Sequence, residues 1–271
     1  MKLLAMAALL TACACVTAPV VYDVAVTREV AFTDTLDMDV FAPVSDESFP
    51  PVVLFHGGSW YGGEKATLDG FARLLATKGL VVYNATYTVG GAGGGYPGSY
   101  EDIRCALAMA ADLSAGAPLT VVGYSAGAHL ASTVVLSGDQ FQSNHCTSTS
   151  TYTVDGFAGL AGPYEAKRYG PLLISFFGTT IGDDPEPWNL GSPYGYLDTA
   201  IRIPIVLVHG DRDQVVQLGF SEDFNTTLAA DGYDVSLTIL EIADHSTIVD
   251  PSTDGGTVVD LIFGLASQSS D

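Results

Sequence analysis

The sequence predicts an α/β fold in which a mostly parallel central sheet is flanked by helices. Four short apolar runs rich in β-branched residues are typical of strands buried on both faces, and four helical patterns alternate with them. This alternation predicts a parallel sheet with helices on both sides. The strand candidates lie at residues 52–55, 80–83, 119–122 and 205–208, and the helical patterns at residues 68–78, 100–113, 126–136 and 216–230.

The rest of the chain predicts one domain with an antiparallel strand and a small insertion. Residues 36–41 alternate apolar and polar side chains, as a half-buried antiparallel strand does. Residues 162–200 are rich in Gly, Pro and aromatics, and we expect a small cap-like insertion over the carboxyl edge of the sheet, where such folds place ligands. The alternative is a loop that simply packs on the body. With 48% hydrophobic and 15% charged residues, we predict a single domain at residues 20–267.

The charge balance of the chain is strongly acidic. Asp and Glu number 31 against 10 Lys and Arg, which gives a formal net charge of -21. Such a surface repels phosphate backbones and anionic headgroups, so nucleic-acid binding is excluded as an expected function. We interpret the excess as a solvated acidic face that maintains solubility.

The N-terminus has the pattern of an export signal. Lys2 precedes an apolar run at residues 3–10 and a stretch of small residues, which predicts a signal peptide at residues 1–12. The tetrapeptide Leu10-Thr11-Ala12-Cys13 resembles the bacterial lipobox, in which the cysteine is acylated. We therefore expect a lipoprotein of the cell envelope anchored through Cys13, with ordinary cleavage and secretion or periplasmic release as the alternative. A lipid anchor would be the chain's contact with a membrane.

Export places the cysteines in a compartment that permits disulfides. Cys105 and Cys146 are then the expected pair, with Cys15 left over, and two unpaired buried thiols are the alternative. The sequence has no CxxC or Cys/His spacing of a zinc site. We therefore expect chemistry without a metal or cofactor.

The strongest motif is Gly123-Tyr124-Ser125-Ala126-Gly127, between an apolar strand candidate and a helical pattern. Glycines on both sides of a serine allow a sharp turn from strand to helix, which exposes the hydroxyl at the helix N-terminus. This context predicts that Ser125 is a catalytic nucleophile.

A second glycine motif, His56-Gly57-Gly58-Ser59-Trp60, follows the strand candidate at residues 52–55. Acyl transfer needs preorganised donors for an oxyanion, and glycines let backbone N–H groups approach it. We expect Gly57, Gly58 and the N–H of Ala126 to form the oxyanion hole. A glycine turn without a ligand is the alternative.

The expected base and acid follow in the C-terminal third. His245 comes after the strand candidate at residues 235–240 and is predicted to activate the serine. Two aspartates, Asp211 and Asp213, follow the strand that ends at residue 208, and we favour Asp213, since Asp211 is placed as a turn or capping residue. The order Ser, Asp, His along the chain fits a known hydrolase arrangement.

The other histidines have structural interpretations. His56 and His209 stand where strands end and are expected to brace loops, whereas His129 lies one turn into the helix after Ser125. His145 falls in a polar loop.

Together these motifs resemble the α/β-hydrolase superfamily, in particular its esterase and lipase branch with an HGG-type oxyanion loop. That branch includes bacterial feruloyl-esterase-like and hormone-sensitive-lipase-like carboxylesterases, and the resemblance spans about residues 51–249. It implies the α/β-hydrolase fold, and we expect Trp60 and Tyr124 to contact substrate. Ser59 departs from the pattern, because relatives often carry a third glycine there.

The expected function is that of a serine carboxylesterase that hydrolyses small-molecule esters through an acyl-enzyme intermediate. An amide-cleaving hydrolase of exopeptidase or formamidase type could use the same three side chains. A non-catalytic binding protein on the same scaffold is the third hypothesis. No oligomeric state is predicted.

Overall fold

The computed structural model describes residues 20–92, 95–253 and 255–268. The predicted signal peptide, Cys13 and Cys15 lie outside these residues. No helix within the described ranges has both the length and the apolar character required to cross a membrane.

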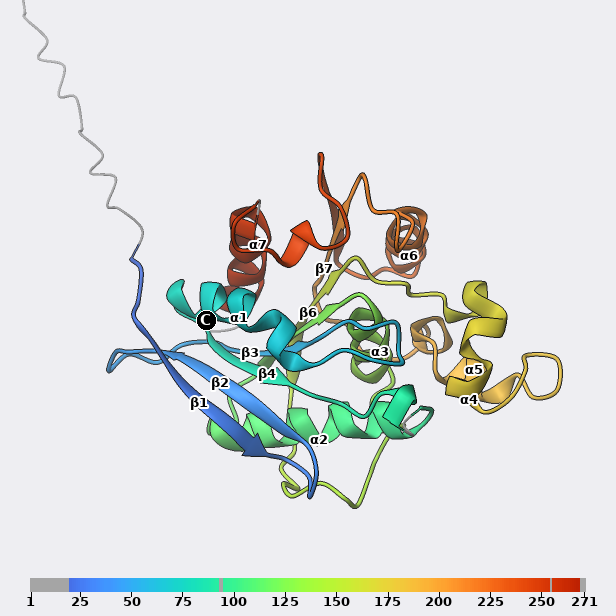
Figure 1. Ribbon diagram of the computed structural model, residues 1–271, viewed down its shortest axis with the longest axis horizontal. Coiled ribbons are helices and arrows are strands. Elements are labelled where there is room, and N and C mark those ends of the chain that lie inside the picture. The colour runs from blue at the N-terminus through green and yellow to red at the C-terminus, as the bar shows by residue number, and fades with distance from the viewer. Residues whose placement is uncertain (1–19, 93–94, 254, 269–271) are drawn as a thin grey trace, which may run out of the picture.

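A single eight-stranded sheet forms the centre of the molecule, with the strand order β1-β2-β4-β3-β5-β6-β7-β8 (Figure 1). The strands β1 and β2 pair antiparallel with their neighbours, whereas β3 to β8 run parallel. This arrangement confirms the predicted α/β class with a mostly parallel sheet. The strands are β1 (Val24–Ala31), β2 (Asp37–Pro43), β3 (Pro51–Phe55), β4 (Val81–Ala85), β5 (Leu119–Tyr124), β6 (Val154–Leu160), β7 (Ile205–Gly210) and β8 (Val235–Leu240).

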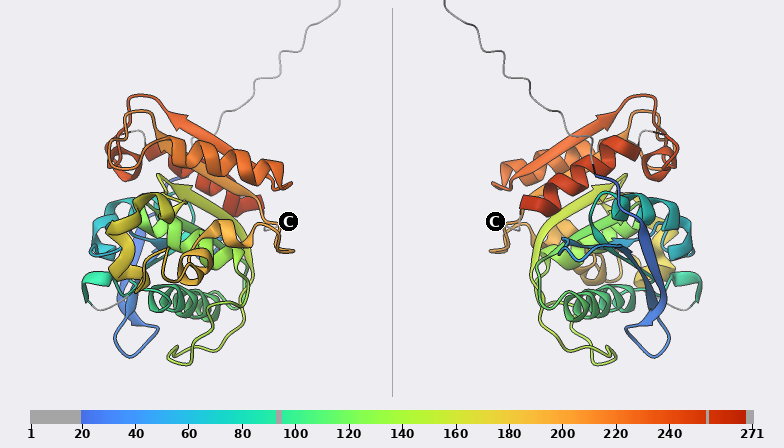
Figure 2. Two further views of the ribbon diagram at one scale, coloured as in Figure 1. Left: turned by 90° about the vertical axis from the view of Figure 1, so that its right-hand side faces the viewer. Right: turned by 90° about the vertical axis from the view of Figure 1, so that its left-hand side faces the viewer.

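Helices cover both faces of the sheet and create two apolar cores. The buried side chains of α1 and α7 belong to one core, and those of α2, α3 and α6 belong to the other. Figure 2 shows these layers from two sides of the molecule. The helices are α1 (Asp69–Thr77), α2 (Gly98–Leu113), α3 (Ala126–Leu136), α4 (Ile174–Phe177), α5 (Glu186–Leu190), α6 (Gly219–Ala230) and α7 (Gly255–Ser267), and short 3₁₀ segments lie at Lys65–Leu68, Gly90–Ala92, Ala166–Leu173, Pro193–Tyr196 and Thr247–Val249.

The strand β6 has no counterpart among the predicted strands, because its glycines interrupt the apolar pattern. A Cβ at Gly156 would lie 2.9 Å from Leu265 Cγ on α7, and one at Gly159 would lie 2.1 Å from Tyr164 Oη. The missing side chains therefore let α7 and Tyr164 pack directly on the strand. Close backbone approach explains both glycines.

The connection from β6 to β7 contains the aromatic segment that was expected as an insertion. It leaves β6 at its carboxyl end, the edge at which β5 also ends, and includes α4 and α5. Trp188 is fully buried, and its ring centroid lies 4.3 Å from that of Phe177. Its indole N–H donates to Thr179 O at 3.0 Å. The buried aromatic rings of this segment therefore join the core on the α2 and α3 side of the sheet, where Phe176 packs on Tyr100 and Tyr164 on Phe224.

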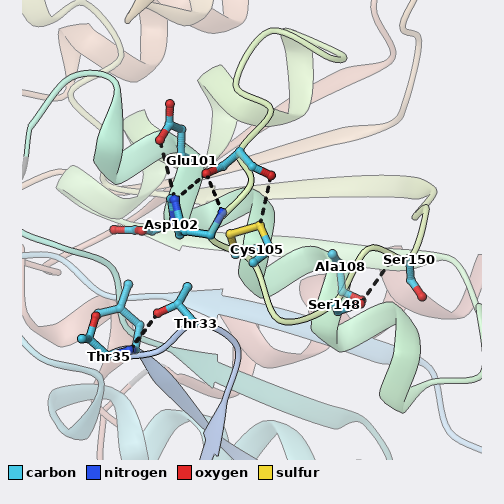
Figure 3. The surroundings of a disulfide bond; sticks show 12 residues. Thr33, Thr35, Glu101, Asp102, Cys105, Ala108, Ser148 and Ser150 are labelled. Atoms are coloured by element: carbon cyan, nitrogen blue, oxygen red, sulfur yellow. Dashed lines mark hydrogen bonds and ion pairs between the residues drawn. A yellow bond between two sulfur atoms is a disulfide. The ribbon is translucent and has the colours of Figure 1, made fainter.

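A disulfide joins Cys105 on α2 to Cys146 in the connection between α3 and β6. The Cα atoms lie 4.9 Å apart, and Cys105 is fully buried. Figure 3 shows further contacts of the same connection with α2, including Ser148 Oγ donating to Ala108 O at 3.3 Å. The pair thus fixes this polar connection on the helix.

Removing the disulfide should lower the stability of the protein without changing its site. The bond closes a sequence separation of 41 residues, for which the chain-entropy model gives about 4 kcal/mol. We expect the double variant Cys105→Ala/Cys146→Ala to lose roughly 2–5 kcal/mol of unfolding free energy in urea titrations. An unchanged unfolding midpoint would contradict this expectation.

Candidate active site

Ser125 occupies a strained turn between β5 and α3. Its backbone has φ 55° and ψ -124°, and its N–H donates to Leu160 O at 2.8 Å. A Cβ at Gly123 would lie 2.5 Å from Ala128 Cα, and one at Gly127 would lie 2.3 Å from His56 O. Only glycines allow strand, turn and helix to approach this closely, and the turn places the serine side chain at the helix N-terminus.

The structure brings Ser125, His245 and Asp213 together, although 120 and 32 residues separate the hydrogen-bonded pairs. His245 Nε2 lies 2.9 Å from Ser125 Oγ, and His245 Nδ1 lies 2.6 Å from Asp213 Oδ2. Because a carboxylate only accepts, Nδ1 carries the proton and Nε2 accepts from the serine hydroxyl. The three side chains come from the loops after β5, β8 and β7.

The Asp213 carboxylate is fully buried and surrounded by donors. Its Oδ1 accepts the N–H groups of Val215 and Val216, each at 2.8 Å. Burial raises the pKa of this carboxyl, but hydrogen bonds from His209, His245 and Val216 N–H outweigh burial and hold the pKa well below its usual range. Asp213 is therefore charged at neutral pH. The helix α6 begins at Gly219 and not at the expected residue 216.

The neighbouring aspartates have different partners. Asp211 Oδ1 accepts the N–H of Ile242 at 2.7 Å and so joins the loops after β7 and β8. Asp244 Oδ1 accepts the N–H groups of Ser246 and Thr247, each at 3.0 Å. The carboxylate on the His245 ring is thus that of Asp213, as the sequence favoured.

The glycine loop after β3 lies against the serine. A Cβ at Gly57 would lie 2.8 Å from Ser125 Cβ, and Gly58 has φ 139° with its Cβ position 1.9 Å from Gly62 O. Within the described residues, no hydrogen bond uses the N–H of Gly58 or of Ala126, the first residue of α3. Two unpaired donors therefore remain close to the serine turn.

Two buried histidines support this loop. His56 stacks on Tyr87 at 4.4 Å, and its Nδ1 donates to Gly57 O at 2.7 Å. His129 Nδ1 accepts the indole N–H of Trp60 at 3.1 Å. The histidines thus connect the glycine loop to the segment after β4 and to α3. A bracing role was expected for His56, and none was specified for His129.

Burial keeps both histidines neutral. It lowers the pKa of His129 to about 3, against a smaller opposing effect of the Gly191 carbonyl. Burial also lowers the pKa of His56, whose hydrogen bond to Gly57 opposes it. Neither imidazole therefore adds positive charge to the site at neutral pH.

The two residues expected to contact substrate have structural partners. Trp60 is only 4% exposed, and its indole touches His129 and Tyr169, with ring centroids 5.5 and 5.3 Å away. Tyr124 donates its hydroxyl to the backbone carbonyl of His245 at 2.9 Å. Both side chains hold the loops of the site in place, and their contact with substrate stays a prediction.

Tyr169 is a neighbour of the site that the sequence interpretation did not single out. Its ring stacks on Phe220 at 5.4 Å, and burial followed by the charge of Asp213 raises the pKa of its hydroxyl. The residue lies in the 3₁₀ segment Ala166–Leu173, so the connection from β6 to β7 reaches the site here. Its only signal in the sequence was membership of an aromatic-rich stretch.

No group of three or more His, Cys, Asp or Glu side chains in the described part of the chain is arranged to hold a metal ion.

A parallel sheet, a serine in a strained turn after a central strand, and a histidine and aspartate from later loops define an α/β hydrolase of the esterase and lipase branch with an HGG-type loop. The BD-FAE family model matches residues 38–228, which is more than half of the chain. The chain therefore belongs to the BD-FAE family.

More distant similarities accompany this match. A kynurenine formamidase of Danio rerio is 26% identical over 222 residues, which cover 80% of this chain and 73% of the relative. A truncated carbohydrate esterase from gut microbiota superposes with a TM-score of 0.78 at 16% identity, covering 92% of this chain and 99% of that one. The bifunctional GH43-CE of Bacteroides eggerthii gives 0.76 at 20% identity, covering 89% of this chain but only 35% of the other. The two structures show a common fold.

The buried histidines predict a loss of stability on mild acidification. Below pH about 6.5 the unfolded chain binds protons at His56 and His129 more readily than the folded chain does. The free energy of unfolding therefore decreases as the pH is lowered. The slope should approach about 1.4 kcal/mol per pH unit for His129, whose folded pKa is lowered to about 3, and His56 contributes in the same direction. Urea titrations between pH 7 and pH 5 measure it.

A matched pair of variants isolates the contribution of His129. His129→Gln should reduce this slope, whereas Leu130→Val at the neighbouring buried position of α3 removes no titratable group and should leave the slope unchanged. An equal slope in the wild type and in His129→Gln would show that the buried imidazole is protonated in the folded state.

Proposed function

We propose that the chain is a serine carboxylesterase that hydrolyses small-molecule carboxylic esters through an acyl-enzyme intermediate. The observation that carries this proposal is the hydrogen-bonded series from Ser125 Oγ through His245 to Asp213, beside the unpaired N–H groups of Gly58 and Ala126. Membership of the BD-FAE family and the likeness to a carbohydrate esterase support it.

The proposed reaction begins with proton transfer from Ser125 Oγ to His245 Nε2. The oxygen attacks the ester carbonyl carbon, and the N–H groups of Gly58 and Ala126, with that of Gly57, stabilise the negative charge that develops on the carbonyl oxygen. Protonated His245 then donates to the leaving alcohol, and the C–O bond of the ester breaks. Water, deprotonated by His245, attacks the acyl-enzyme, the bond from the acyl carbon to Ser125 Oγ breaks as His245 returns the proton to Oγ, and the acid leaves.

Asp213 has a supporting part in these steps. Its carboxylate fixes the Nδ1–H tautomer of His245, which leaves Nε2 free to accept the serine proton. The charged carboxylate also stabilises the imidazolium that forms in each half-reaction. Since the hydrogen bonds around it hold its pKa low, Asp213 keeps this charge across the neutral range.

The proposal includes export of the protein from the cytoplasm. We place the mature enzyme outside the cytoplasm, either anchored through a lipid on Cys13 or released after cleavage. The disulfide between Cys105 and Cys146 supports an oxidising compartment. The acidic composition is compatible with a soluble surface facing that compartment.

A formamidase-type activity is the second candidate, because the similarity to kynurenine formamidase covers 80% of the chain. The same serine and histidine could attack an aryl formamide and protonate the departing amine. The substrate decides between the two candidates, whereas the nucleophile is common to both.

Replacing the nucleophile should abolish turnover. Ser125→Ala is expected to lower kcat by roughly 10⁴- to 10⁶-fold, because no hydroxyl remains to form the acyl-enzyme. The assay compares acetyl, butyryl, octanoyl and feruloyl esters with an aryl formamide, and we expect higher kcat/KM on esters. Near-wild-type rates in Ser125→Ala would refute the nucleophile, and a preference for the formamide would favour the second candidate.

The two aspartates after β7 give a matched comparison. Asp213→Asn should lower kcat by about 10⁴-fold, because an amide favours the wrong tautomer of His245. Asp211→Asn keeps an oxygen for the Ile242 N–H and should retain most of the activity. Equal losses in the two variants, at equal melting temperatures, would contradict the assignment of Asp213.

A further inference from the structure

A second imidazole lies on the far side of Asp213. His209, near the end of β7, is fully buried, and its Nε2 lies 3.3 Å from Asp213 Oδ2 and 2.9 Å from Val216 O. Its Nδ1 lies 2.7 Å from Ser221 Oγ on α6, a hydroxyl that is fully buried as well. The proposed reaction does not use either side chain.

The surroundings of His209 define its tautomer. Nε2 faces two oxygen atoms that only accept, the Asp213 carboxylate and the Val216 carbonyl, so it carries the proton. Nδ1 is then bare and accepts from the Ser221 hydroxyl, which can donate. The two acceptors at Nε2 therefore fix the imidazole in the Nε2–H form, and the Ser221 hydroxyl satisfies Nδ1 on the other side of the ring.

Asp213 is thus flanked by two hydroxyl–imidazole pairs. On one side Ser125 and His245 meet its Oδ2, and on the other side Ser221 and His209 approach the same oxygen. The pairs differ in exposure, because the His245 side chain is 14% exposed whereas that of His209 is sealed from solvent. Only the first pair can reach a substrate.

We propose that His209, whose Nε2–H faces Val216 O and Asp213 and whose Nδ1 is held by Ser221, is a positioning residue that orients the Asp213 carboxylate and moderates its attraction for the His245 proton. This inference rests on the proposed serine hydrolase function. His209 bridges Asp213 and Val216, so it also closes the loop that carries the acid.

The electrostatics of Asp213 agree with this assignment. Burial raises the pKa of the Asp213 carboxyl, and both imidazoles, His209 and His245, act against burial and lower it. Burial, followed by the negative charge of Asp213, also raises the pKa of the Tyr124 and Tyr169 hydroxyls. If the N–H donor of His209 is removed, the Asp213 carboxylate is less neutralised on that side and attracts the proton of His245 more strongly.

The test compares two replacements of the histidine. His209→Leu removes the donor, and we expect kcat/KM to fall about 10- to 100-fold, the range seen when a group that orients a reacting residue is lost. The acidic limb of the kcat/KM profile should move to higher pH by about 0.5–1 unit, the scale of one hydrogen bond. His209→Gln retains an N–H donor and should recover most of the rate and the wild-type limb.

Two further variants keep the test decisive. Ser221→Ala removes only the hydroxyl that holds Nδ1 of the buried ring, so His209 is less firmly placed against Asp213, and the limb should shift in the same direction even if His209→Leu does not fold. Phe224→Leu on the same helix perturbs the packing against Tyr164 without touching Asp213, and should lower the melting temperature with an unchanged pH profile. Fluorophosphonate labelling counts the active serines in each preparation.

Three results would overturn the inference. They are an unshifted limb in folded His209→Leu, a rate loss that His209→Gln does not recover, and an unshifted limb in Ser221→Ala. If Ser125→Ala abolishes activity while these variants match Phe224→Leu, the inference fails and the hydrolase function stands. If Ser125→Ala keeps its activity, the proposed function itself fails.

Discussion

The close packing of three backbone segments around Ser125 is the constraint on which the site depends. The end of β5, the start of α3 and the loop after β3 meet with no space for a Cβ at Gly57, Gly123 or Gly127. The serine adopts φ 55°, a conformation that costs free energy and persists because the strand and the helix on either side hold it. The same closeness that creates the strain brings the loop N–H groups to the hydroxyl, so strain and oxyanion donors have one origin.

Buried imidazoles extend this constraint away from the serine. His129 holds Trp60, His56 holds the Gly57 carbonyl, and His209 holds Asp213. Each ring offers one donor and one acceptor at a fixed separation, and among the described residues His209 uses both, whereas His129 is bonded at Nδ1 alone. A network of this kind costs stability when a partner is missing and rigidifies the site when all partners are present. The loops around the serine are thus fixed by polar side chains in addition to apolar packing.

Local patterns were sufficient to predict much of this arrangement. Buried strands appear as apolar runs, and the glycines around Ser125 follow from the turn itself, so β3, β4, β5 and β7 and the serine's place were predictable. The choice of Asp213 over Asp211 followed from its position beyond the strand end. Partnerships across the fold left no such pattern: Trp60 and His129 are 69 residues apart, and Ser221 meets His209 only because α6 packs beside β7. The glycines of β6 record contacts with α7 and Tyr164, and sequence periodicity cannot show contacts of that kind.

The aromatic connection between β6 and β7 shows how position changes the meaning of a residue type. Rings such as Trp188 and Phe177 satisfy one another inside the connection, and their number therefore says little about a ligand. Tyr169 differs, because it lies between Trp60 of the glycine loop and Phe220 at the start of α6, within the influence of the Asp213 charge. Within the described residues its hydroxyl has no hydrogen-bond partner, unlike those of Tyr124 and Tyr196. A single side chain of the connection thus joins the glycine loop to the start of α6, and its position carries information that the aromatic content of the segment does not.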